Sequence, residues 1–561
     1  MTRRKRIPEE VNAPGNAGRL HRVRSDKGSK FALYREIADV WFTVDCRRMK
    51  KLMNAAIKFN DEISNEIEKP ADEAAKNWSD IDWGKAEAFV NRLQIRIAKA
   101  TQNRKTNLAK RLGYLLTHSF YAKAIAIKTI TTNKGKNTPG IDGITWKSAA
   151  EKINAISQLD SAKYQSQPLR RVYIEKFGKK EKRPLSIPTM KDRSMQMLYK
   201  LALDPIAETL ADTSSFGFRK FRGTHDAMEY AFTLLSRRYS PQWVLEGDIK
   251  GCFDNISHQW LMENVQMDKN ILQAFLKAGF IYQKELFPTI NGTPQGGTIS
   301  PTLANITLDG IGQALSDKFW RNQKGTYDIR NNRLKVHFVR FADDFIVTAE
   351  TREAAIEAQT IIDCFLQKRG LRLSETKTAI THISDGFEFL GWHFQKYGSK
   401  LIIQPSKKSI MKITTNVSKV ISQYRTSTQK ALILKLNPML SGWANYHQAV
   451  CSSRVFKKLD HILWNMLWHW AKRRHPKKSH HWIRKRYWST KGLRNWVFAD
   501  EECELICVSS TPIVRHRKIK LSMNPFLDAD YYENIKKIQK QRRRVAKYGL
   551  AACLPGQVSN V

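Results

Sequence analysis

Two adjacent acidic residues stand between two strand-like segments of the sequence. Asp343 and Asp344 follow Val336-His-Phe-Val-Arg340 and the link Phe341-Ala, and they precede Phe345-Ile-Val-Thr348. Two β-type runs joined by so short an acidic link predict a hairpin with both carboxylates at its tip. Adjacent carboxylates repel each other, so a site that keeps both ionised has a cation nearby, and such hard oxygen ligands suit Mg²⁺. An isolated Asp-Asp pair in a turn is usually turn chemistry alone, so the rest of the chain decides between the two interpretations.

A third carboxylate, Asp248, stands at the end of another predicted strand, Trp243–Ile249. Gly251-Cys-Phe-Asp-Asn-Ile256 follows, and a helix is predicted to begin at His258. If Asp248 lies beside the hairpin pair, the three carboxylates can surround two metal ions. Two ions about 4 Å apart activate a primer 3′-hydroxyl and stabilise a leaving pyrophosphate, which is the chemistry of phosphoryl transfer.

A glycine-rich segment supplies a surface for a nucleotide. Asn291-Gly-Thr-Pro-Gln-Gly-Gly-Thr-Ile-Ser-Pro301 predicts a turn that opens a helix. Gly296 and Gly297 have no side chain, so the backbone can approach a nucleotide closely there. Short strand patterns alternate with helical ones from about residue 168 to about 395, which is typical of an α/β or α+β domain.

Helical patterns frame this region on both sides. Apolar residues recur at helical spacing after Asp82. From about 405 to 495 the pattern is helical again, and one apolar stripe ends at Lys472-Arg-Arg-His475, where Pro476 stops the helix. The two stripes consist of Ala86, Phe89, Val90, Leu93, Ile97 and Ala100, and of Val455, Phe456, Leu459, Ile462, Leu463, Met466, Leu467 and Trp470.

The charge of the chain indicates its kind of partner. Its 561 residues include 96 Lys and Arg against 52 Asp and Glu, a formal net charge of +44. So large a charge repels itself in the folded state and favours a polyanionic partner, nucleic acid first and an acidic membrane surface second. The 42% hydrophobic content excludes a disordered or fibrous chain. Neither a membrane-spanning run nor a secretory signal is evident, and seven dispersed cysteines suit a reducing cytosol, so we expect a cytoplasmic protein without membrane contacts.

Basic residues gather in two C-terminal stretches. Residues 471–490 hold eight Lys or Arg and no Asp or Glu, with Trp482, Tyr487 and Trp488 interleaved. Lys536–Arg544 holds six basic residues in nine. A run like the first can be a solvated face, but the interleaved aromatic residues favour a nucleic-acid surface.

The motifs stand in an order that resembles the reverse transcriptase–maturases encoded by group II introns, closest to the chloroplast-like lineage also found in cyanobacteria. The resemblance runs from about Trp78 to Phe526. In chain order the motifs are Thr138-Pro-Gly-Ile-Asp-Gly-Ile-Thr-Trp146, Arg183-Pro-Leu-Ser-Ile-Pro-Thr-Met-Lys-Asp-Arg193, Ser215-Phe-Gly-Phe-Arg219, Arg222-Gly-Thr-His-Asp226, the Asp248 strand, Thr293-Pro-Gln-Gly-Gly297, Phe341-Ala-Asp-Asp344, Leu373-Ser-Glu-Thr-Lys-Thr378, Phe389-Leu-Gly-Trp392 and Leu436-Asn-Pro-Met-Leu-Ser-Gly-Trp-Ala-Asn-Tyr446.

The resemblance implies an α+β fold: a right-hand polymerase, with fingers and an antiparallel palm sheet, followed by an α-helical maturase thumb. Five regions follow from it: a basic leader of unreadable role at 1–75, an N-terminal extension of the reverse transcriptase at 76–165, fingers and palm at 166–400, a helical thumb or maturase-specific domain at 401–500, and a basic DNA-binding-like tail at 501–561.

The family also implies roles for single residues. Asp248, Asp343 and Asp344 are the palm carboxylates that hold two Mg²⁺ ions, with Asp248 and Asp343 as the expected direct ligands. Phe253 crowds the sugar 2′ position or is simply a core residue. Lys176 and Arg183 meet the triphosphate, contact a phosphate backbone, or are solvated surface. Gln295 lies against the nascent base pair, Lys377 serves the leaving pyrophosphate or is a surface lysine, and Phe389–Trp392 holds the primer end.

The implied function is that of an RNA-directed DNA polymerase that copies its intron RNA, with RNA template, DNA primer, target DNA and deoxynucleotides as partners, and that binds the intron RNA to assist splicing. The alternative is a splicing maturase without polymerase activity; a retron-like enzyme and an RNA-dependent RNA polymerase are weaker. Phe341 stands where most relatives have Tyr, and no hydroxyl is needed there for metal binding. The stretch Arg515–Phe526 resembles the link that often precedes an HNH endonuclease, and no such metal-dependent domain is expected after it.

Overall fold

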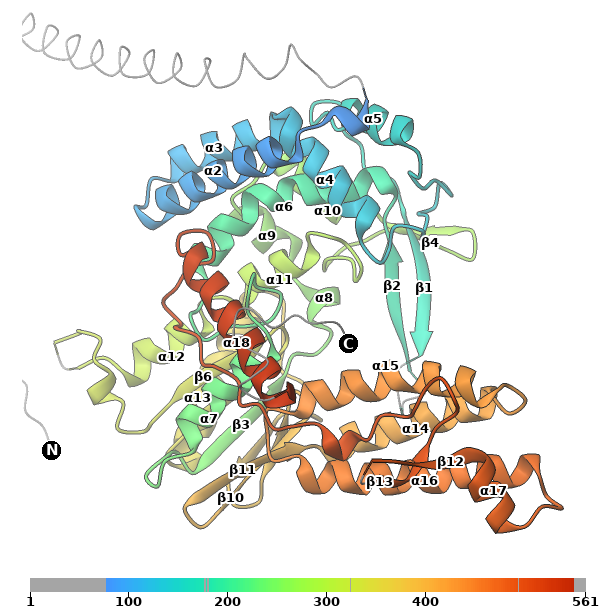
Figure 1. Ribbon diagram of the computed structural model, residues 1–561. Helices are drawn as coiled ribbons and strands as arrows, with labels where there is room; N and C mark the ends of the chain where they lie inside the picture. Colours follow the sequence, from blue (N-terminus) through green and yellow to red (C-terminus); the bar gives the residue numbers. More distant parts are fainter. Residues whose placement is uncertain (1–76, 176–177, 179–180, 323, 493, 549–561) are drawn as a thin grey trace, which may run out of the picture. The chain divides into compact units, whose positions relative to one another are not determined.

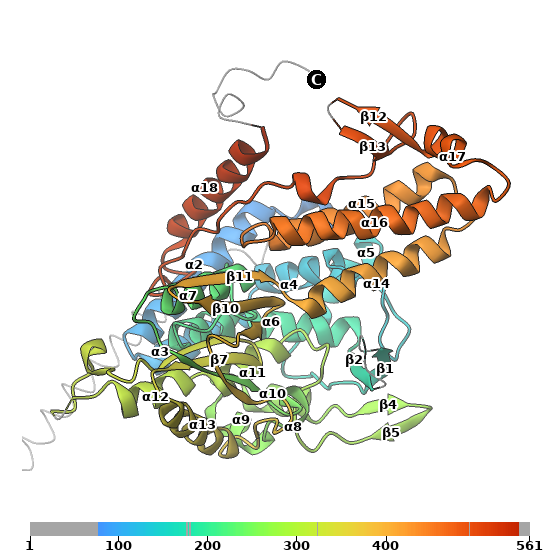
Figure 2. The ribbon, with the colours of Figure 1, turned by 90° about the horizontal axis from the view of Figure 1, so that it is seen from below.

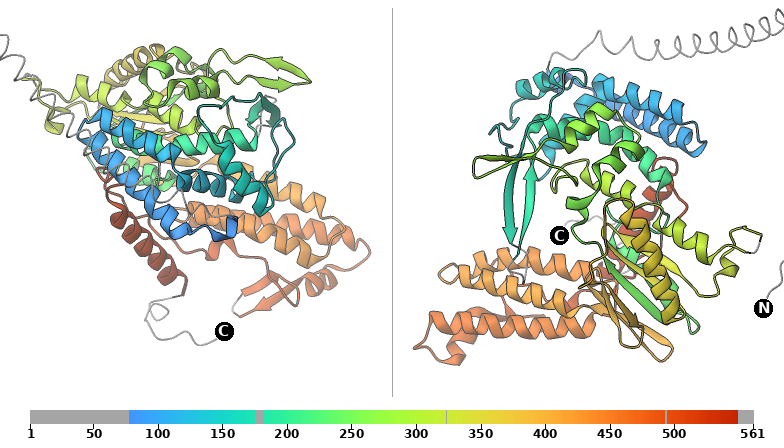
Figure 3. Two further views of the ribbon diagram at one scale, coloured as in Figure 1. Left: turned by 90° about the horizontal axis from the view of Figure 1, so that it is seen from above. Right: turned by 180° about the vertical axis from the view of Figure 1, so that it is seen from behind.

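Local sequence signals place the first helices. The computed structural model describes residues 77–175, 178, 181–322, 324–492 and 494–548, so predictions on residues 1–75 and Lys176 lie outside the described residues. The helix predicted after Asp82 is α2, whose first turn Asp82 caps by accepting a hydrogen bond from the Lys85 amide, and its predicted stripe is buried except for the half-buried Phe89. It packs against α3 and α6 (Figures 1 and 3). The elements are η1 (Trp78–Asp80), α2 (Trp83–Gln102), α3 (Thr106–His118), α4 (Phe120–Thr132), α5 (Ala149–Gln158) and α6 (Met190–Leu210).

A second group of elements forms the β1 sheet, whose strand order is β2-β1-β4-β5. β1 (Leu169–Glu175) pairs antiparallel with β2 (Lys182–Ile187) and parallel with β4 (Phe280–Tyr282), which pairs with β5 (Glu285–Phe287). The loop at Thr138–Gly143 is bound to this sheet and to α6. The buried Arg193 guanidinium donates to the carbonyl oxygens of Thr138 and Pro188, and Arg170 donates to that of Pro139. Buried carbonyl groups need such partners, so this loop has a defined position.

The central sheet has the strand order β6-β7-β3-β8, with β6 (His337–Phe341), β7 (Asp344–Ala349), β3 (Trp243–Asp248) and β8 (Ala379–His382), all antiparallel. Successive side chains of a strand point to opposite faces. Leu245 and Val347 accordingly join the core that includes α13 (Arg352–Gln367), while Val244 and Ile346 join the core that includes α7 (Thr224–Leu235). Both faces of the sheet are covered, and the predicted α+β class is confirmed (Figure 1).

Short helices connect the strands of the central sheet: α8 (Cys252–Asn255), α9 (His258–Asn264), α10 (Lys269–Leu276), α11 (Ser300–Leu308), α12 (Ile311–Phe319) and η2 (Ile329–Asn331). α9 begins at His258 as predicted. A three-stranded sheet follows, in the order β11-β10-β9, from β9 (Phe387–Phe389), β10 (Trp392–Tyr397) and β11 (Lys400–Pro405). The domain boundary predicted at residue 400 therefore falls inside β11, which pairs with β10, and the helical region begins with Lys407.

The C-terminal helical region has its own core (Figure 2). It contains α14 (Lys407–Gln423), α15 (Gln429–His447), α16 (Ser453–Arg474), α17 (His480–Tyr487), β12 (Trp488–Lys491), β13 (Arg494–Phe498) and η3 (Val508–Ser510). α16 ends at Arg474, before Pro476, as predicted. The interpretation of Tyr487 and Trp488 as a nucleic-acid surface was wrong. Both are buried in this core, because β12 and β13 bring them against α16.

The segment after η3 returns to α6 and α7. His516 Nε2 lies 2.7 Å from the Asp226 carboxylate, and Arg222 donates to the Leu521 carbonyl oxygen. α18 (Ala529–Tyr548) follows; Tyr532 is buried in it, and the Lys536 ammonium lies 3.8 Å from the centre of the Phe221 ring. Within the described residues, no helix is long and apolar enough to cross a membrane.

We predict that Gly247→Ala destabilises the protein by about 1–3 kcal/mol, the usual cost of overpacking a core. Gly247 lies opposite Phe345 in the central sheet, and a Cβ atom would fall into the Phe345 ring. Urea unfolding measures the change. The control is Gly442→Ala in α15, where a Cβ meets no neighbour and alanine favours the helix by about 1 kcal/mol. If Gly247→Ala and Gly442→Ala were equally stable, the close packing of the Phe345 ring against Gly247 would be contradicted.

Candidate active site

The strand register brings the three predicted aspartates together. Asp248 ends β3 and lies directly opposite Asp344, the first residue of β7. Asp343 stands in the two-residue turn between β6 and β7, which begins at Ala342 with a φ of 58°. The predicted hairpin is therefore present, with Asp343 in its turn and Asp344 at its first strand position. Directly opposite residues have Cβ atoms about 5 Å apart, so the site concentrates negative charge at one end of the sheet.

The protein around these carboxylates resists their ionisation. Burial raises the pKa of Asp343 above its ordinary value, and the charge of Asp248 raises it further. The Asp344 side chain reaches solvent on one side, but the protein around it raises its pKa to about 6, with added repulsion from Asp343 and Asp248. Such shifts are typical of buried carboxylates that share one site.

Two basic side chains supply positive charge to the site. The Lys377 ammonium lies 2.5 Å from an Asp248 carboxylate oxygen, and its turn is fixed because the Ser374 amide donates to the Asp248 carbonyl oxygen. Arg183, exposed on β2, lowers the pKa of Asp343 through its charge. The Lys377 side chain is half exposed, so a divalent cation can replace this ion pair at small cost.

The donor set has the chemistry of a divalent-cation site. All three side chains offer carboxylate oxygens, the ligand type that Mg²⁺ prefers. In the conformation described, no group of three or more Asp, Glu, His or Cys side chains within the described ranges is arranged as metal ligands. The Cys252 thiol lies beside the site, but burial raises its pKa to about 12, so it remains protonated.

The glycine-rich turn lies against the β1 sheet. The Ser186 amide on β2 donates to the Gln295 carbonyl oxygen at 2.7 Å. Gly296 adopts a φ of 119°, and a Cβ there would lie 2.6 Å from the Ser186 oxygen. Only glycine fits both the conformation and the space. The Gln295 side chain donates to the Asp254 carboxylate at 3.2 Å, so it faces the segment that follows Asp248.

Phe253 is half buried on the short helix α8, close to the carboxylates in sequence. The ring of Phe218, which is half exposed, meets it edge-on at 6.3 Å between centroids. The Thr293 amide donates to the Phe253 carbonyl oxygen, which joins α8 to the glycine-rich turn. The structure therefore brings Asp248, Asp343 and Asp344 together, with Arg183 and Lys377 contributing charge. Phe253 and Gln295 are joined to each other through the glycine-rich turn and α8, and Lys176 lies outside the described residues.

The segment Phe389–Trp392 is tied to the C-terminal helical region. Leu390 and Gly391 form a turn with φ of 51° and 83°. The Tyr446 hydroxyl donates to the Leu390 carbonyl oxygen, and the Tyr446 ring stacks on Trp392 at 4.6 Å. Phe389 and Trp392 are buried, so the backbone of the turn, rather than these rings, is the part that can meet a ligand.

The sequence did not predict a buried polar network that lies beneath the β6–β7 hairpin. The Arg340 side chain is fully buried; it donates to Asn305 Oδ1 at 3.1 Å, to the Ala342 carbonyl oxygen at 3.3 Å and to Asp309 Oδ1 at 2.5 Å. Asn305 in turn donates to the Gly217 carbonyl oxygen, and a Cβ on Gly217 would collide with the backbone of Ala342. Arg340 therefore connects the turn that carries Asp343 to α11. No local pattern marks this network, because its members are far apart in sequence.

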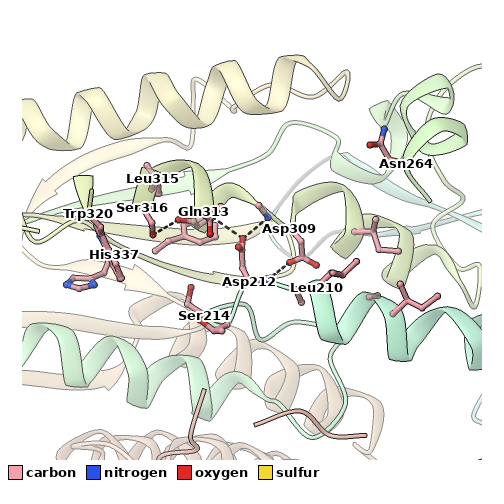
Figure 4. A pocket seen from close by; sticks show the side chains of 18 of the residues that line it. Leu210, Asp212, Ser214, Asn264, Asp309, Gln313, Leu315, Ser316, Trp320 and His337 are labelled. Atoms are coloured by element: carbon pink, nitrogen blue, oxygen red, sulfur yellow. Dashed lines mark hydrogen bonds between the residues drawn. The ribbon is translucent and has the colours of Figure 1, made fainter. Parts of the chain in front are cut away.

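Asp309 also borders a cavity of about 570 Å³ behind the hairpin (Figure 4). There the Asp212 amide donates to Asp309 Oδ1, and the Asp212 carboxylate accepts from the Gly310 and Gly312 amides at the start of α12. The cavity does not include the three aspartates of the candidate site. Its polar wall stabilises the network that supports them.

Three family models match the chain. Residues 174–394 match "Reverse transcriptase (RNA-dependent DNA polymerase)", residues 78–159 match "N-terminal domain of reverse transcriptase", and residues 410–488 match "Group II intron, maturase-specific domain". The first match agrees with the predicted polymerase fold.

Among curated proteins, the group II intron-encoded protein LtrA of Lactococcus lactis subsp. cremoris is 32% identical over 381 residues, which cover 58% of this chain and 62% of LtrA. Protein YkfC of Escherichia coli (strain K12) is 30% identical over 383 residues, 62% of this chain and 97% of YkfC. The chain thus spans about three fifths of LtrA and nearly all of YkfC. A solved telomerase structure from Candida albicans aligns at 12% identity with a TM-score of 0.33, over 58% of this chain and 65% of that one, which is too low to carry an argument.

We predict that Arg340→Met lowers the free energy of unfolding by about 3–5 kcal/mol, because it leaves Asp309 buried without its partner. Burial already raises the Asp309 pKa to about 6 from 3.8, and Arg340 opposes that rise. The folded variant therefore binds a proton more tightly than the unfolded chain, so its stability falls as the pH rises from about 4 through 6 and above.

Urea unfolding at pH 5 and pH 8 checks both statements, with exposed Arg330→Met as the control. An Arg340→Met variant as stable as the control, or one that is more stable at pH 8 than at pH 5, would contradict this role of Arg340.

Proposed function

The chain belongs to the group II intron-encoded reverse transcriptase–maturases, and we propose that it copies RNA into DNA and binds intron RNA to assist splicing and mobility of the intron. The observation that supports this most directly is the convergence of Asp248, Asp343 and Asp344 at one end of an antiparallel sheet. The proposed substrates are an RNA template, a DNA primer and deoxynucleoside triphosphates, with target DNA as a further partner. We place this activity in the cytoplasm.

Reverse transcriptases generally use divalent metal ions. We propose that the three aspartates hold two Mg²⁺ ions, with Asp248 and Asp343 as direct ligands. When bound, such ions activate a primer 3′-hydroxyl and stabilise the leaving pyrophosphate. The raised pKa values of Asp343 and Asp344 fit this assignment, since a bound cation removes the repulsion that opposes their ionisation.

The surrounding residues position the nucleotide in this proposal. Arg183 binds a triphosphate oxygen through its forked guanidinium, and Lys176 adds a point charge. Gln295, on a backbone held by Ser186, lies against the new base pair. Lys377 leaves Asp248 when a cation binds and then neutralises the pyrophosphate. Phe253 limits the space beside the sugar 2′ position, which favours deoxynucleotides.

The proposed domains follow from membership of the same family. Residues 76–165 extend the polymerase, residues 166–400 form its fingers and palm, and residues 401–500 form the thumb and maturase-specific domain. Within this last range, the exposed basic residues of α16 and α17 offer a surface for the phosphates of intron RNA. The basic tail, 501–561, binds DNA. The Leu390–Gly391 turn, held by Tyr446, contacts the primer end.

We predict that Asp343→Ala abolishes DNA synthesis and leaves RNA affinity within about twofold, because one turn carboxylate contributes little to a phosphate-binding surface. Primer extension on a primed RNA template with Mg²⁺ and deoxynucleotides measures synthesis, and filter binding measures affinity. Asp385→Ala, in an exposed turn after β8, is the matched control. Full synthesis by Asp343→Ala would contradict the site. No synthesis by the unaltered chain, together with restored splicing, would select the alternative of a maturase without polymerase activity.

We predict that Phe253→Ala raises ribonucleotide incorporation relative to deoxynucleotide incorporation by about 10-fold or more, the range that a steric pocket commonly provides. Single-nucleotide extension with dNTP and rNTP gives the ratio. Phe218→Ala removes the neighbouring exposed ring and should leave the ratio unchanged. An unchanged ratio in Phe253→Ala would assign Phe253 to the core rather than to sugar selection.

A further inference from the structure

Four tryptophan rings meet where α16 packs against the β12–β13 hairpin. Trp464 and Trp468 lie one turn apart on α16, with parallel rings 5.5 Å apart. The buried Trp488 on β12 packs against both. Trp496 on β13 meets Trp464 and Trp468 at 5.8 and 6.1 Å, yet it is 40% exposed. A large aromatic ring is thus held by a rigid cluster and still presented to solvent.

The backbone at Trp496 is strained. Its φ of 61° lies in the left-handed region, which bulky residues rarely adopt. The hairpin register shifts between Ser489 and Lys491, which marks an irregularity opposite Trp496. Glycine is the usual residue where such a bulge needs a left-handed conformation, and bulges re-aim side chains next to functional sites. A tryptophan that keeps this conformation points to a role for its ring outside the core.

The charge around the ring has one sign. The Arg484 guanidinium lies 4.8 Å from the centre of the Trp496 ring, and Lys491 and Arg494 on the same hairpin are exposed. Residues 471–499 contain ten Lys or Arg and no Asp or Glu. An exposed ring among cations suits an unpaired base and its phosphates, because bases stack on aromatic rings while phosphates bind the cations. A protein partner would require acidic residues throughout its contact face.

We propose that Trp496, supported by Trp464, Trp468 and Arg484, is a stacking site for an unpaired nucleotide of RNA. The inference rests on the proposed maturase function, since it names how the C-terminal helical region holds RNA. Trp464 and Trp468 fix the ring, and Arg484 supplies charge for the neighbouring phosphate. Arg484 belongs to the basic stretch 471–490 that the sequence indicated, whereas Trp496 lies on β13, beyond that stretch.

Ultraviolet crosslinking of the full chain to a single-stranded 20-nucleotide RNA with 5-iodouridine tests the proposal. Mass spectrometry should find the crosslink on the peptide that carries Trp496. Trp496→Gly should remove this crosslink and weaken binding of the same RNA about 10-fold, the effect of losing one stacked base. Trp496→Phe, which keeps a ring, should bind nearly as well as the unaltered chain.

Thermal unfolding and a matched control variant separate this role from a merely structural one. Trp496→Gly loses the ring contacts with Trp464 and Trp468, whereas glycine adopts a φ of 61° without strain, so thermal unfolding sets the temperature range in which the variant is folded and its RNA binding is compared. Tyr239→Ala is the matched control, as Tyr239 is 77% exposed with Arg238 5.5 Å from its ring centre. Its RNA binding should not change. RNA binding, crosslinking and thermal unfolding do not require DNA synthesis, so a lack of polymerase activity in the unaltered chain would not affect this test. A Trp496→Gly variant that binds RNA normally, with or without a lower unfolding temperature, would overturn the proposal.

Discussion

Repulsion among three carboxylates is the constraint on which the rest of the structure depends. Asp248 and Asp344 oppose each other across two strands, and Asp343 stands in the adjoining turn. Like charges so close together cannot all ionise without a countercharge. In the described conformation Lys377 supplies part of it, while burial, together with repulsion between the carboxylates, raises the pKa values of Asp343 and Asp344. Three carboxylates gathered at one end of a sheet offer the oxygen ligands that suit hard divalent cations.

A rigid support keeps these charges at the same end of the sheet. The Arg340 guanidinium donates a hydrogen bond to the Ala342 carbonyl oxygen, and it also donates to the side chains of Asn305 and Asp309. Gly217 lets the backbone of Ala342 approach closely, and Gly247 leaves room for the Phe345 ring. A Cβ atom at either glycine would collide with these neighbours. The support is buried and close-packed, so the turn has little freedom to relieve its repulsion by moving apart. The glycine-rich turn is joined to β2 and α8 through backbone hydrogen bonds, from Ser186 to Gln295 and from Thr293 to Phe253.

The sequence predicted what depends on local periodicity. The helix after Asp82, the strand ending at Asp248, the hairpin at 343–344 and the end of α16 before Pro476 are all present as expected. It did not predict contacts between residues far apart in the chain. Arg340 and Asp309 look like ordinary charged residues until the fold buries them together. In the sequence, Tyr487 and Trp488 are typical of surface residues in a basic run, but the fold packs both rings against α16 in the core and leaves the Trp496 ring partly exposed. The Lys377–Asp248 pair similarly joins residues 129 positions apart.

The most direct test of the central claim is to locate the bound cation itself. Fe²⁺ that replaces Mg²⁺ in a carboxylate site generates hydroxyl radicals with ascorbate and peroxide, and these cut the nearby polypeptide. We expect cleavage of the full chain near Asp248 and near Asp343–Asp344, suppressed by excess Mg²⁺. Cleavage confined to other parts of the chain, or at only one of these two segments, would contradict a shared cation site formed by the three aspartates.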